Sequence, residues 1–340
     1  MTKVIIIAEA GVNHNGDIDL AFKLIDAAAE AGVDYIKFQT FITEFIVDKS
    51  AQKAEYQKTT TSSEETQFEM IKKLEFTFED FHKLKAYCEK KNVKFLTTAA
   101  DLVSLEKIDE YSLDYIKIAS GELTNILFLR KAALKKKPII LSTGMATLSE
   151  IDIALKTLRD GGASIDDITV LHCNTEYPTP FEDVNLKAMN TIAQSFKVKV
   201  GYSDHTLGIE IPIAAVAMGA TIIEKHFTID KKLHGPDHAA SLTPEELKAM
   251  VKAIRNVECG IFGSGRKEPS KSESKNIIIV RKSLFASNSI SKGDIFSESN
   301  LILKRPGDGI PAIDIDKILG KKANSNIEKG QKLNYTDIAW

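Results

Sequence analysis

The chain has 340 residues, of which 43% are hydrophobic and 27% are charged, and this composition excludes a disordered or fibrous protein. Its 45 basic and 47 acidic side chains leave a net charge of -2, which argues against nucleic-acid binding. The apolar run Val4 to Ala8 is too short to cross a bilayer, and no basic region with a cleavage site precedes it, so we expect a cytoplasmic protein. The three cysteines show no CxxC spacing, so neither a disulfide framework nor a zinc cluster is expected.

Short β-branched runs alternate with amphipathic helical patterns along residues 1–260, and this alternation predicts parallel strands joined by crossover helices. The predicted strands are Val4–Glu9, Tyr35–Gln39, Val93–Thr98, Tyr115–Ala119, Pro138–Ser142, Thr169–His172, Val198–Tyr202 and Thr221–Glu224. Predicted helices include Leu20–Ala31, Phe78–Lys90, Leu148–Asp160 and Pro244–Glu258. Eight such units predict an α/β fold, the (β/α)8 or TIM barrel.

Three segments depart from this alternation. The polar stretch Thr59–Glu65 predicts an insertion over one mouth of the barrel. Residues 261–280 combine glycines with a polar, charged run and predict a linker. Residues 281–340 hold two strand-like runs, Ser283–Ala286 and Asn300–Lys304, between turn-rich stretches, and predict a small irregular or β domain. So short a chain buries little surface, so we expect this domain to contact a partner.

Polar residues gather at the predicted strand ends, where a TIM barrel carries its catalytic groups. Residues two apart in a strand point to the same side, which selects pairs of side chains at one mouth. The selected pairs are Lys37 with Gln39, Ser120 with Glu122, Ser203 with His205, and Glu224 with His226, and Thr98 and Lys117 end two further strands.

His205 and His226 follow the seventh and eighth strands, which are neighbours in a closed barrel. Two imidazoles beside carboxylates and open positions suit a divalent metal such as manganese that acts as a Lewis acid. The alternative is that these histidines only form hydrogen bonds in a polar mouth.

Lys37 and Lys117 would repel each other in one mouth unless an anion lies between them, which predicts a bound phosphate or carboxylate. Hydroxyls of Thr98, Ser120 and Ser203 would bind the same oxygens. Alternatively, the lysines reach water or pair with Glu122 or Glu224. The carboxylates Glu9, Glu122, Glu224 and Asp237 suit acid–base catalysis or binding of sugar hydroxyls, although Glu9 could equally cap the loop after the first strand.

Several motifs, taken in order along nearly the whole chain, resemble those of the bacterial sialic acid synthases. They are AEAGVNHNG from Ala8, KFQT from Lys37, LSTGM from Leu141, HCNTEYPTP from His172, YSDHT from Tyr202, EKHFT from Glu224, GPD from Gly235 and KRPG from Lys304. The resemblance implies a phosphoenolpyruvate-dependent barrel followed by an antifreeze-like (SAF) domain. It also implies a domain-swapped homodimer in which that domain covers the partner's active site.

The implied reaction joins phosphoenolpyruvate to open-chain N-acetylmannosamine and releases phosphate by C–O cleavage, forming N-acetylneuraminate. The resemblance assigns the metal, Mn²⁺ or alternatively Mg²⁺ or Co²⁺, to His205 and His226. It assigns phosphoenolpyruvate to Lys37, Thr98, Lys117, Ser120, Asn174 and Ser203, with the metal and the lysines stabilising developing negative charge. The position of the amide stays open between Asn174 and the next residue. Sugar contacts fall to Glu9, Gln39, Tyr177, Asp237 and, from the partner's SAF domain, Arg305. Glu122 and Glu224 are alternative candidates for handling the water proton.

Three other functions stay open at this point. An N,N'-diacetyllegionaminate synthase would perform the same chemistry on a 6-deoxy diacetamido sugar. A Schiff-base aldolase would use Lys37 or Lys117 as the nucleophile. A non-catalytic carbohydrate-binding protein would use the C-terminal domain for recognition, although the row of polar strand ends argues against it. One departure from the family concerns Thr97–Ala100, which stands in place of Ser-Thr-Pro-Phe but keeps the hydroxyl of Thr98.

Overall fold

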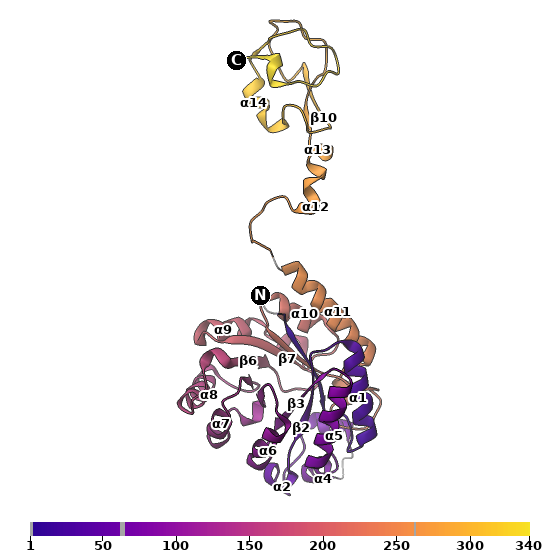
Figure 1. Cartoon of the computed structure of the whole chain (residues 1–340), viewed down its shortest axis with the longest axis vertical. Helices are drawn as coiled ribbons and strands as arrows, with labels where there is room; N and C mark the ends of the chain where they lie inside the picture. Colours follow the sequence, from indigo (N-terminus) through magenta and orange to yellow (C-terminus); the bar gives the residue numbers. More distant parts are fainter. Residues whose placement is uncertain (1–2, 62–64, 262) are drawn as a thin grey trace. The chain divides into compact units, whose positions relative to one another are not determined.

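The computed structural model describes residues 3–61, 65–261 and 263–340 (Figure 1). The chain divides into two compact units, unit 1 over Met1–Phe262 and unit 2 over Gly263–Trp340. Each unit has its own hydrophobic core and is described separately.

Unit 1 is a closed barrel of eight parallel strands in chain order, so the predicted TIM barrel is confirmed. The strands are β1 (Ile5–Gly11), β2 (Tyr35–Thr40), β3 (Lys94–Ala99), β4 (Ile116–Ile118), β5 (Ile139–Ser142), β6 (Ile168–Cys173), β7 (Lys199–Asp204) and β8 (Ile222–His226). Pairing of β1 with β8 closes the cylinder, with Glu9 opposite His226. Each observed strand overlaps a strand predicted from the sequence.

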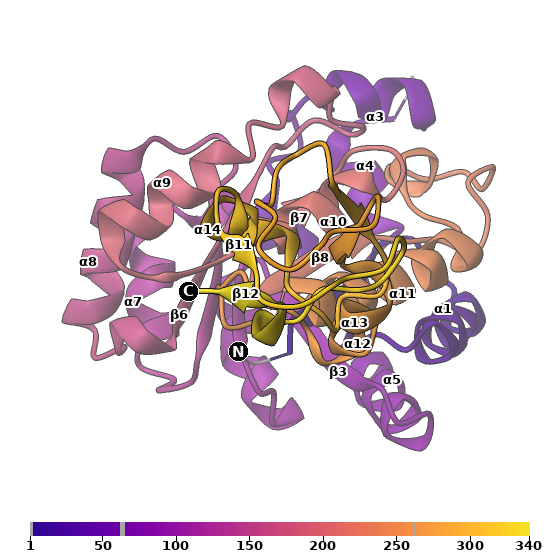
Figure 2. The same cartoon turned by 90° about the horizontal axis from the view of Figure 1, so that it is seen from above.

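Helices surround the strands of unit 1 (Figure 2). They are α1 (Ile18–Ala31), α5 (Phe78–Lys90), α6 (Leu102–Lys107), α7 (Ile126–Ala133), α8 (Leu148–Asp160), α9 (Lys187–Phe196), α10 (Glu210–Ala217) and α11 (Pro244–Ile261). Local sequence explains their limits. In α1, Asp17 caps the first turn by accepting a hydrogen bond from the Asp19 backbone, and Gly32 ends the helix at a φ of 78°, a conformation that favours glycine. Helices α5 and α8 occupy the residues predicted for them.

A completely buried ion pair joins β7 and β8 on the side of the strands that faces away from the barrel interior. Lys225 and Asp204 lie opposite each other in the strand register, and both side chains are completely buried. The Lys225 ammonium donates to a carboxylate oxygen of Asp204 and to the backbone oxygen of Thr206. The Thr206 hydroxyl and backbone N–H also donate to Asp204. This pair therefore ties the ends of β7 and β8 together.

The segment between β2 and α5 is an insertion at the carboxyl end of the barrel and holds α2 (Thr43–Ile46), α3 (Glu55–Thr60) and α4 (Gln67–Lys72). Figure 1 shows α2 and α4 at the end opposite the N-terminus. Of the predicted polar insertion Thr59–Glu65, residues 62–64 lie outside the described residues, and the stretch begins inside α3. The insertion also contains apolar residues. Two of them, Phe41 and Leu74, pack with Val12 in a small core separate from the barrel core.

Unit 2 is small and contains α12 (Lys271–Ser274), α13 (Asn276–Val280), α14 (Ile315–Ile318) and two antiparallel pairs, β9 (Ser283–Ala286) with β10 (Leu301–Lys304) and β11 (Lys322–Ala323) with β12 (Ile338–Ala339). Its core includes Leu284, Phe296 and Leu333. The linker predicted over 261–280 differs from the structure, because α12 and α13 fall within it, and residue 262 lies outside the described residues. Ser270 caps α12 and explains why a polar run starts a helix there.

Two further expectations concern cysteines and membranes. Cys88, Cys173 and Cys259 are free, as their spacing predicted. Among the described residues, no helix combines the length and the apolar character that crossing a bilayer requires.

Candidate active site

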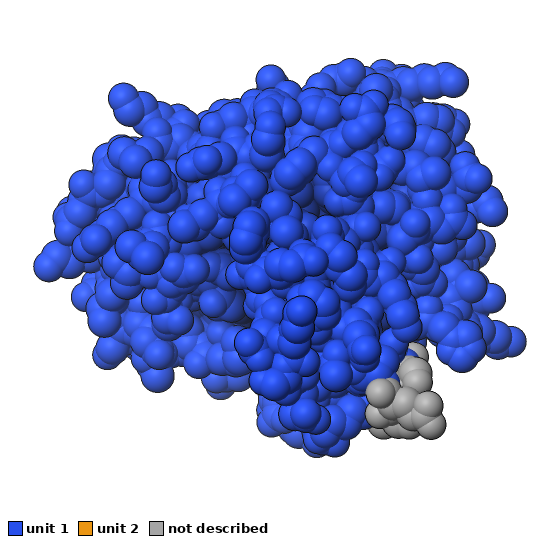
Figure 3. Space-filling model, turned by 90° about the horizontal axis from the view of Figure 1, so that it is seen from below, with its two compact units in different colours: residues 1–262 blue, residues 263–340 orange. Residues whose placement is uncertain are grey.

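A pocket of about 240 Å³ lies at the carboxyl ends of the barrel strands. Figure 3 shows unit 1 from this end. Residues from all eight strands or the loops that follow them line the pocket. Among the residues predicted from sequence, the pocket gathers Glu9, Lys37, Gln39, Thr98, Lys117, Ser120, Tyr177, Ser203, His205, Glu224 and His226. The parity of side chains at the strand ends selected seven of these residues, the strand-end position added Glu9, Thr98 and Lys117, and the family resemblance added Tyr177.

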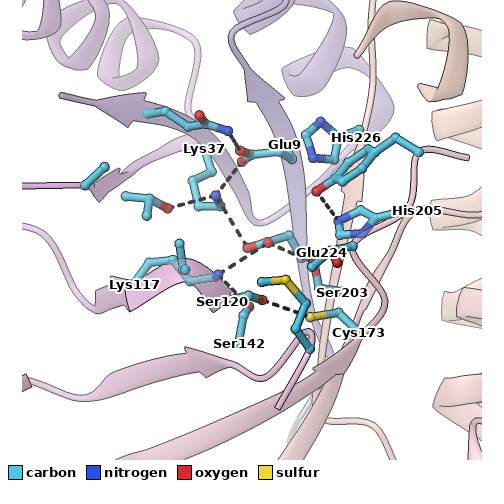
Figure 4. Close-up of a pocket in the computed structure, with 18 residues that line it drawn as sticks. Glu9, Lys37, Lys117, Ser120, Ser142, Cys173, Ser203, His205, Glu224 and His226 are labelled. Atoms are coloured by element: carbon cyan, nitrogen blue, oxygen red, sulfur yellow. Dashed lines mark hydrogen bonds and ion pairs between the residues drawn. The ribbon is translucent and has the colours of Figure 1, made fainter. Parts of the chain in front are cut away.

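Lys37 lies at the centre of a buried polar network (Figure 4). Its ammonium is 2.7 Å from Glu9 Oε2 and 3.8 Å from Glu224 Oε2, and it donates to Thr98 Oγ1 at 2.9 Å. Gln39 Nε2 donates to the other oxygen of Glu9 at 3.3 Å. Lys37 thus contacts two carboxylates and one hydroxyl inside the barrel.

Lys117 lies on the other side of Glu224. Its ammonium donates to Ser142 Oγ at 2.7 Å and is 3.5 Å from Glu224 Oε1, which also accepts a hydrogen bond from Ser203 at 3.0 Å. The carboxylate of Glu224 therefore bridges the two lysines. The structure thus shows the alternative considered for Lys37 and Lys117, in which they pair with a carboxylate. Repulsion between the two ammonium groups therefore does not by itself require a bound anion.

Burial and charge act in opposite directions on these groups. Burial raises the pKa of Glu9 to about 7, although Lys37 opposes this shift. Burial also disfavours the charge on Glu224, but the ammonium groups of Lys117 and Lys37 outweigh it and lower the pKa of this carboxyl. For Lys37, the carboxylates of Glu224 and Glu9 overcome burial and raise the pKa, whereas burial lowers the pKa of Lys117. Glu224 and Lys37 are therefore charged at neutral pH.

His205 and His226 lie side by side, as the neighbouring strands predicted. Their ring centroids are 5.4 Å apart, and the Tyr177 ring stacks on His205 at 4.1 Å. His205 Nδ1 contacts the backbone oxygen of Asn174, which fixes this nitrogen as the donor and leaves the lone pair on Nε2. Nε2 accepts the hydrogen bond of the Tyr177 hydroxyl at 2.9 Å.

The two imidazoles have the chemistry of metal ligands. Burial lowers the pKa of His205 to about 4 and places the pKa of His226 well below its usual value, so both rings are neutral. His226 Nδ1 is buried without a hydrogen-bond partner among the described residues, and Asp237 Oδ2 is 3.8 Å away. Within the described ranges, no group of three or more His, Cys, Asp or Glu side chains is arranged around one ion position. The donor set thus fits a cation with two imidazole ligands and open positions.

Four predicted site residues lie outside this pocket. The Glu122 carboxylate accepts a hydrogen bond from Asn125 at 2.7 Å, and the Asn174 side chain accepts one from the backbone of Glu176, so neither side chain lines the pocket. Asp237 is buried and lines a neighbouring cavity. Arg305 belongs to unit 2, where its Nε donates to the Val280 backbone at 3.1 Å, and its proposed role toward the active site stays a prediction.

Sequence reasoning missed several pocket residues, namely Ser142, Met145, Cys173 and Thr175. Ser142 is the last residue of β5 and carries a polar side chain at a strand end, so the parity test could have found it. Thr175 lines the pocket and Asn174 does not, whereas the position of the amide that would bind phosphoenolpyruvate stays a prediction.

The chain belongs to the NeuB family, because the model of that family matches residues 24–267. The model of the SAF domain matches residues 281–339. The resemblance to sialic acid synthases and the C-terminal SAF domain are therefore confirmed, and the protein is an enzyme of this family.

Individual relatives are similar over almost the whole chain. The N,N'-diacetyllegionaminic acid synthase of Campylobacter jejuni is 52% identical, covering 97% of this chain and 99% of that protein. The synthase of the same name from Legionella pneumophila is 45% identical, covering 98% and 94%. The crystal structure of the N-acetylneuraminic acid synthetase from Leptospira borgpetersenii, in complex with citrate, is 38% identical with a TM-score of 0.70, covering 81% of this chain and 90% of that one. The higher identity to the two N,N'-diacetyllegionaminic acid synthases favours the diacetyllegionaminate alternative over the N-acetylneuraminate synthase expected first.

Proposed function

We propose that this protein is an N,N'-diacetyllegionaminate synthase that condenses phosphoenolpyruvate with an open-chain 6-deoxy diacetamido sugar. The observation that carries the proposal is the 52% identity to a synthase of that name across 97% of the chain. The polar pocket at the strand ends supplies groups that suit this chemistry. N-acetylneuraminate synthase is the second candidate, supported by the 38% identity to the structure of the Leptospira enzyme.

In this proposal, Lys37 and Lys117 bind the phosphate and carboxylate of phosphoenolpyruvate, assisted by hydroxyls around them. These hydroxyls belong to Thr98, Ser120, Ser142 and Ser203. The ammonium and hydroxyl donors would form charge-assisted hydrogen bonds in a buried pocket, where such bonds are strong. Because Glu224 and Glu9 contact the lysines in the structure, the incoming anion would share these cations with the two carboxylates.

His205 and His226 would hold a divalent cation, for which Mn²⁺ is the first candidate. When bound, this cation supplies Lewis-acid polarisation of the aldehyde oxygen. Tyr177 forms a hydrogen bond with His205, and its ring is perpendicular to the ring of His226 in an edge-to-face contact, so it would help to orient both rings and the sugar beside them.

The condensation forms a bond between C3 of phosphoenolpyruvate and the aldehyde carbon of the sugar. Water adds at C2, and cleavage of the C2–O bond releases phosphate with the bridging oxygen and leaves a ketone at C2. The two protons of this water are transferred, one to the aldehyde oxygen and one to phosphate. Glu224 is ionised and hydrogen-bonded to Ser203, so it is the candidate that accepts the water proton, whereas the Glu122 carboxylate does not line the pocket.

We further propose that the enzyme is a homodimer in which each SAF domain serves the barrel of the other subunit. Arg305 of the partner subunit would then contact an acetamido group of the sugar. Arg305 is exposed in unit 2, as a residue that contributes to another surface must be.

The proposal is tested by supplying phosphoenolpyruvate with either the 6-deoxy diacetamido sugar or N-acetylmannosamine. We expect phosphate release and a nine-carbon product with both sugars, and a higher kcat/KM with the former. Phosphoenolpyruvate labelled with ¹⁸O at its bridging oxygen should deliver the label to phosphate. Preference for N-acetylmannosamine would favour the second candidate. A borohydride-trapped adduct of pyruvate on Lys37 or Lys117 would instead indicate a Schiff-base aldolase.

A further inference from the structure

A second cavity of about 190 Å³, here called the side pocket, adjoins the candidate active site at the barrel mouth. The two cavities share Gln39, Ala100 and Tyr177 as lining residues. Asp237, which approaches His226, also lines the side pocket. A ligand in the active site could therefore extend from the catalytic groups into the side pocket.

The rest of the side pocket is strongly apolar. Six aliphatic or aromatic side chains line it without lining the active site, and they are Val12, Phe41, Ile46, Met70, Ile71 and Leu74. All but Val12 belong to the insertion between β2 and α5 or to its edges, and all but Met70 pack in a cluster separate from the main barrel core. The insertion thus presents an apolar wall beside a polar catalytic pocket.

Two polar side chains of the side pocket, Gln39 and Asp237, lie next to residues of the active site. Gln39 Nε2 donates to Glu9 Oε1, and Asp237 Oδ2 is 3.8 Å from His226 Nδ1. Gln57 also lines the cavity, but its side-chain oxygen accepts a hydrogen bond from the Ala54 backbone at the start of α3. A hydroxyl placed against Met70 or Ile71 would therefore meet apolar atoms.

We propose that the side pocket receives the methyl-bearing end of the sugar and makes the enzyme specific for a substrate without a 6-hydroxyl. This inference rests on the proposed function, because the aldehyde of the open-chain sugar must lie at the catalytic groups for its other end to reach the side pocket. Burying a methyl group against apolar walls is favourable, whereas burying a hydroxyl there removes its bonds to water without replacement. Met70, Ile71 and Ile46 then act as specificity-determining residues.

The size of the effect follows from what apolar pockets achieve elsewhere. Such a pocket rejects an analogue that adds a hydroxyl by only about 10²-fold in kcat/KM, because the analogue loses the hydrogen bonds of its own hydroxyl but leaves no polar group of the protein unpaired. We therefore expect a preference of about 10²-fold for the 6-deoxy diacetamido sugar over the diacetamido sugar that keeps its 6-hydroxyl. These two sugars differ at that position alone, so the second acetamido group does not contribute to the comparison.

The experiment measures kcat/KM for both diacetamido sugars at saturating phosphoenolpyruvate in the full-length protein and in two variants. Met70→Gln and Ile46→Asn introduce polar groups into the apolar wall, and each should reduce the preference at least tenfold while the KM for phosphoenolpyruvate stays unchanged. Ile153→Asn, on the exposed side of α8, is the matched control and should leave the preference unaltered. The unchanged KM shows that a variant is folded with an intact active site.

The outcomes separate this inference from the function on which it rests. If neither diacetamido sugar is a substrate, the proposed function is wrong. If the 6-deoxy diacetamido sugar is a substrate but the 6-hydroxy sugar is used equally well, the side pocket does not determine specificity and the proposed function stands. The same conclusion follows if Met70→Gln and Ile46→Asn both keep the wild-type preference.

Discussion

The buried ion pair between Lys225 and Asp204 allows a quantitative test of the barrel's stability. Replacing Lys225 with Met removes the ammonium but keeps most of the side-chain volume, and it leaves the buried Asp204 carboxylate with the Thr206 donors but without its cation. Removing one partner of a buried pair costs about 3–5 kcal/mol, because the remaining charge has lost its counterion but not regained water. We expect Lys225→Met to lower the free energy of unfolding of unit 1 by that amount.

The penalty should also depend on pH. Burial already raises the pKa of Asp204 with Lys225 present, so without Lys225 this carboxyl holds its proton more strongly in the folded state. The unfolded chain releases that proton near the ordinary pKa of 3.8, so folding becomes less favourable as the pH rises above this value. The stability lost by Lys225→Met should therefore be larger at pH 8 than at pH 5.

Urea unfolding followed by circular dichroism measures both effects. Lys248→Met is the matched control, because it breaks an ion pair with Glu30 of 2.9 Å that is exposed and should contribute at most about 1 kcal/mol. The double variant Asp204→Leu with Lys225→Met removes both charges and should recover most of the loss. A loss for Lys225→Met no larger than for Lys248→Met would refute the reasoning.

Three further predictions concern other parts of the chain. Between pH 4.5 and about 7, wild-type stability should fall as the pH rises, because the folded state keeps a proton on Glu9 that the unfolded state releases. Glu9→Gln should flatten this pH dependence in urea unfolding, and an equally steep dependence in the variant would contradict the prediction. A randomly reassorted 1:1 mixture of Arg305→Ala and Lys37→Met subunits, each inactive alone, should regain about a quarter of wild-type activity if Arg305 acts in trans, because half of the dimers are mixed and each has one intact site. No activity should return if Arg305 acts within one subunit. Gly201→Ala should lower the free energy of unfolding by about 1–3 kcal/mol, measured by thermal unfolding, because the new Cβ would lie 2.4 Å from a backbone oxygen of β8. Gly260→Ala in α11 is the control, because its Cβ would enter open space and should not destabilise the protein.

The barrel and much of the candidate site could be predicted because strand ends follow simple rules. Runs of β-branched residues located the strands to within a few residues, and the closure of the barrel placed His205 next to His226. The alternation of side chains along extended backbone then correctly placed Lys37, Gln39 and Glu224 on the side of their strands that faces the pocket.

The same rule failed where the backbone is not extended. Strand β4 ends at Ile118, and Ser120–Glu122 forms a 3₁₀ helix, so a spacing of two residues no longer keeps side chains on one face. Glu122 consequently turns toward Asn125 while Ser120 stays in the pocket. At Asn174, a local hydrogen bond to the backbone of Glu176 holds the side chain away from the pocket.

Charge partners and sugar preference were also beyond the reach of sequence patterns. The positions of residues at strand ends indicate that a lysine and a glutamate lie at the same end of the barrel. The pairing of Lys37 with Glu9 and the bridging position of Glu224, however, depend on side-chain distances of a few ångströms. The apolar wall formed by Met70 and Ile46 comes from an insertion whose residues carry no recognisable motif. The sequence motifs favoured an N-acetylneuraminate synthase, whereas the most similar relatives reported above favour the N,N'-diacetyllegionaminate synthase alternative.

The polar pocket is formed by the barrel strands, whereas the apolar wall beside it is formed mainly by the insertion, and this separation affects how such enzymes can diversify. The side chains that line the candidate active site come from all eight strands or the loops that follow them, so reshaping this pocket requires changes at many positions along the chain. Most of the apolar wall, in contrast, comes from the single stretch between Phe41 and Leu74. If the side pocket selects the sugar as we propose, transplanting this one stretch between homologous synthases should change the preferred sugar and leave the residues of the strand-end pocket unchanged.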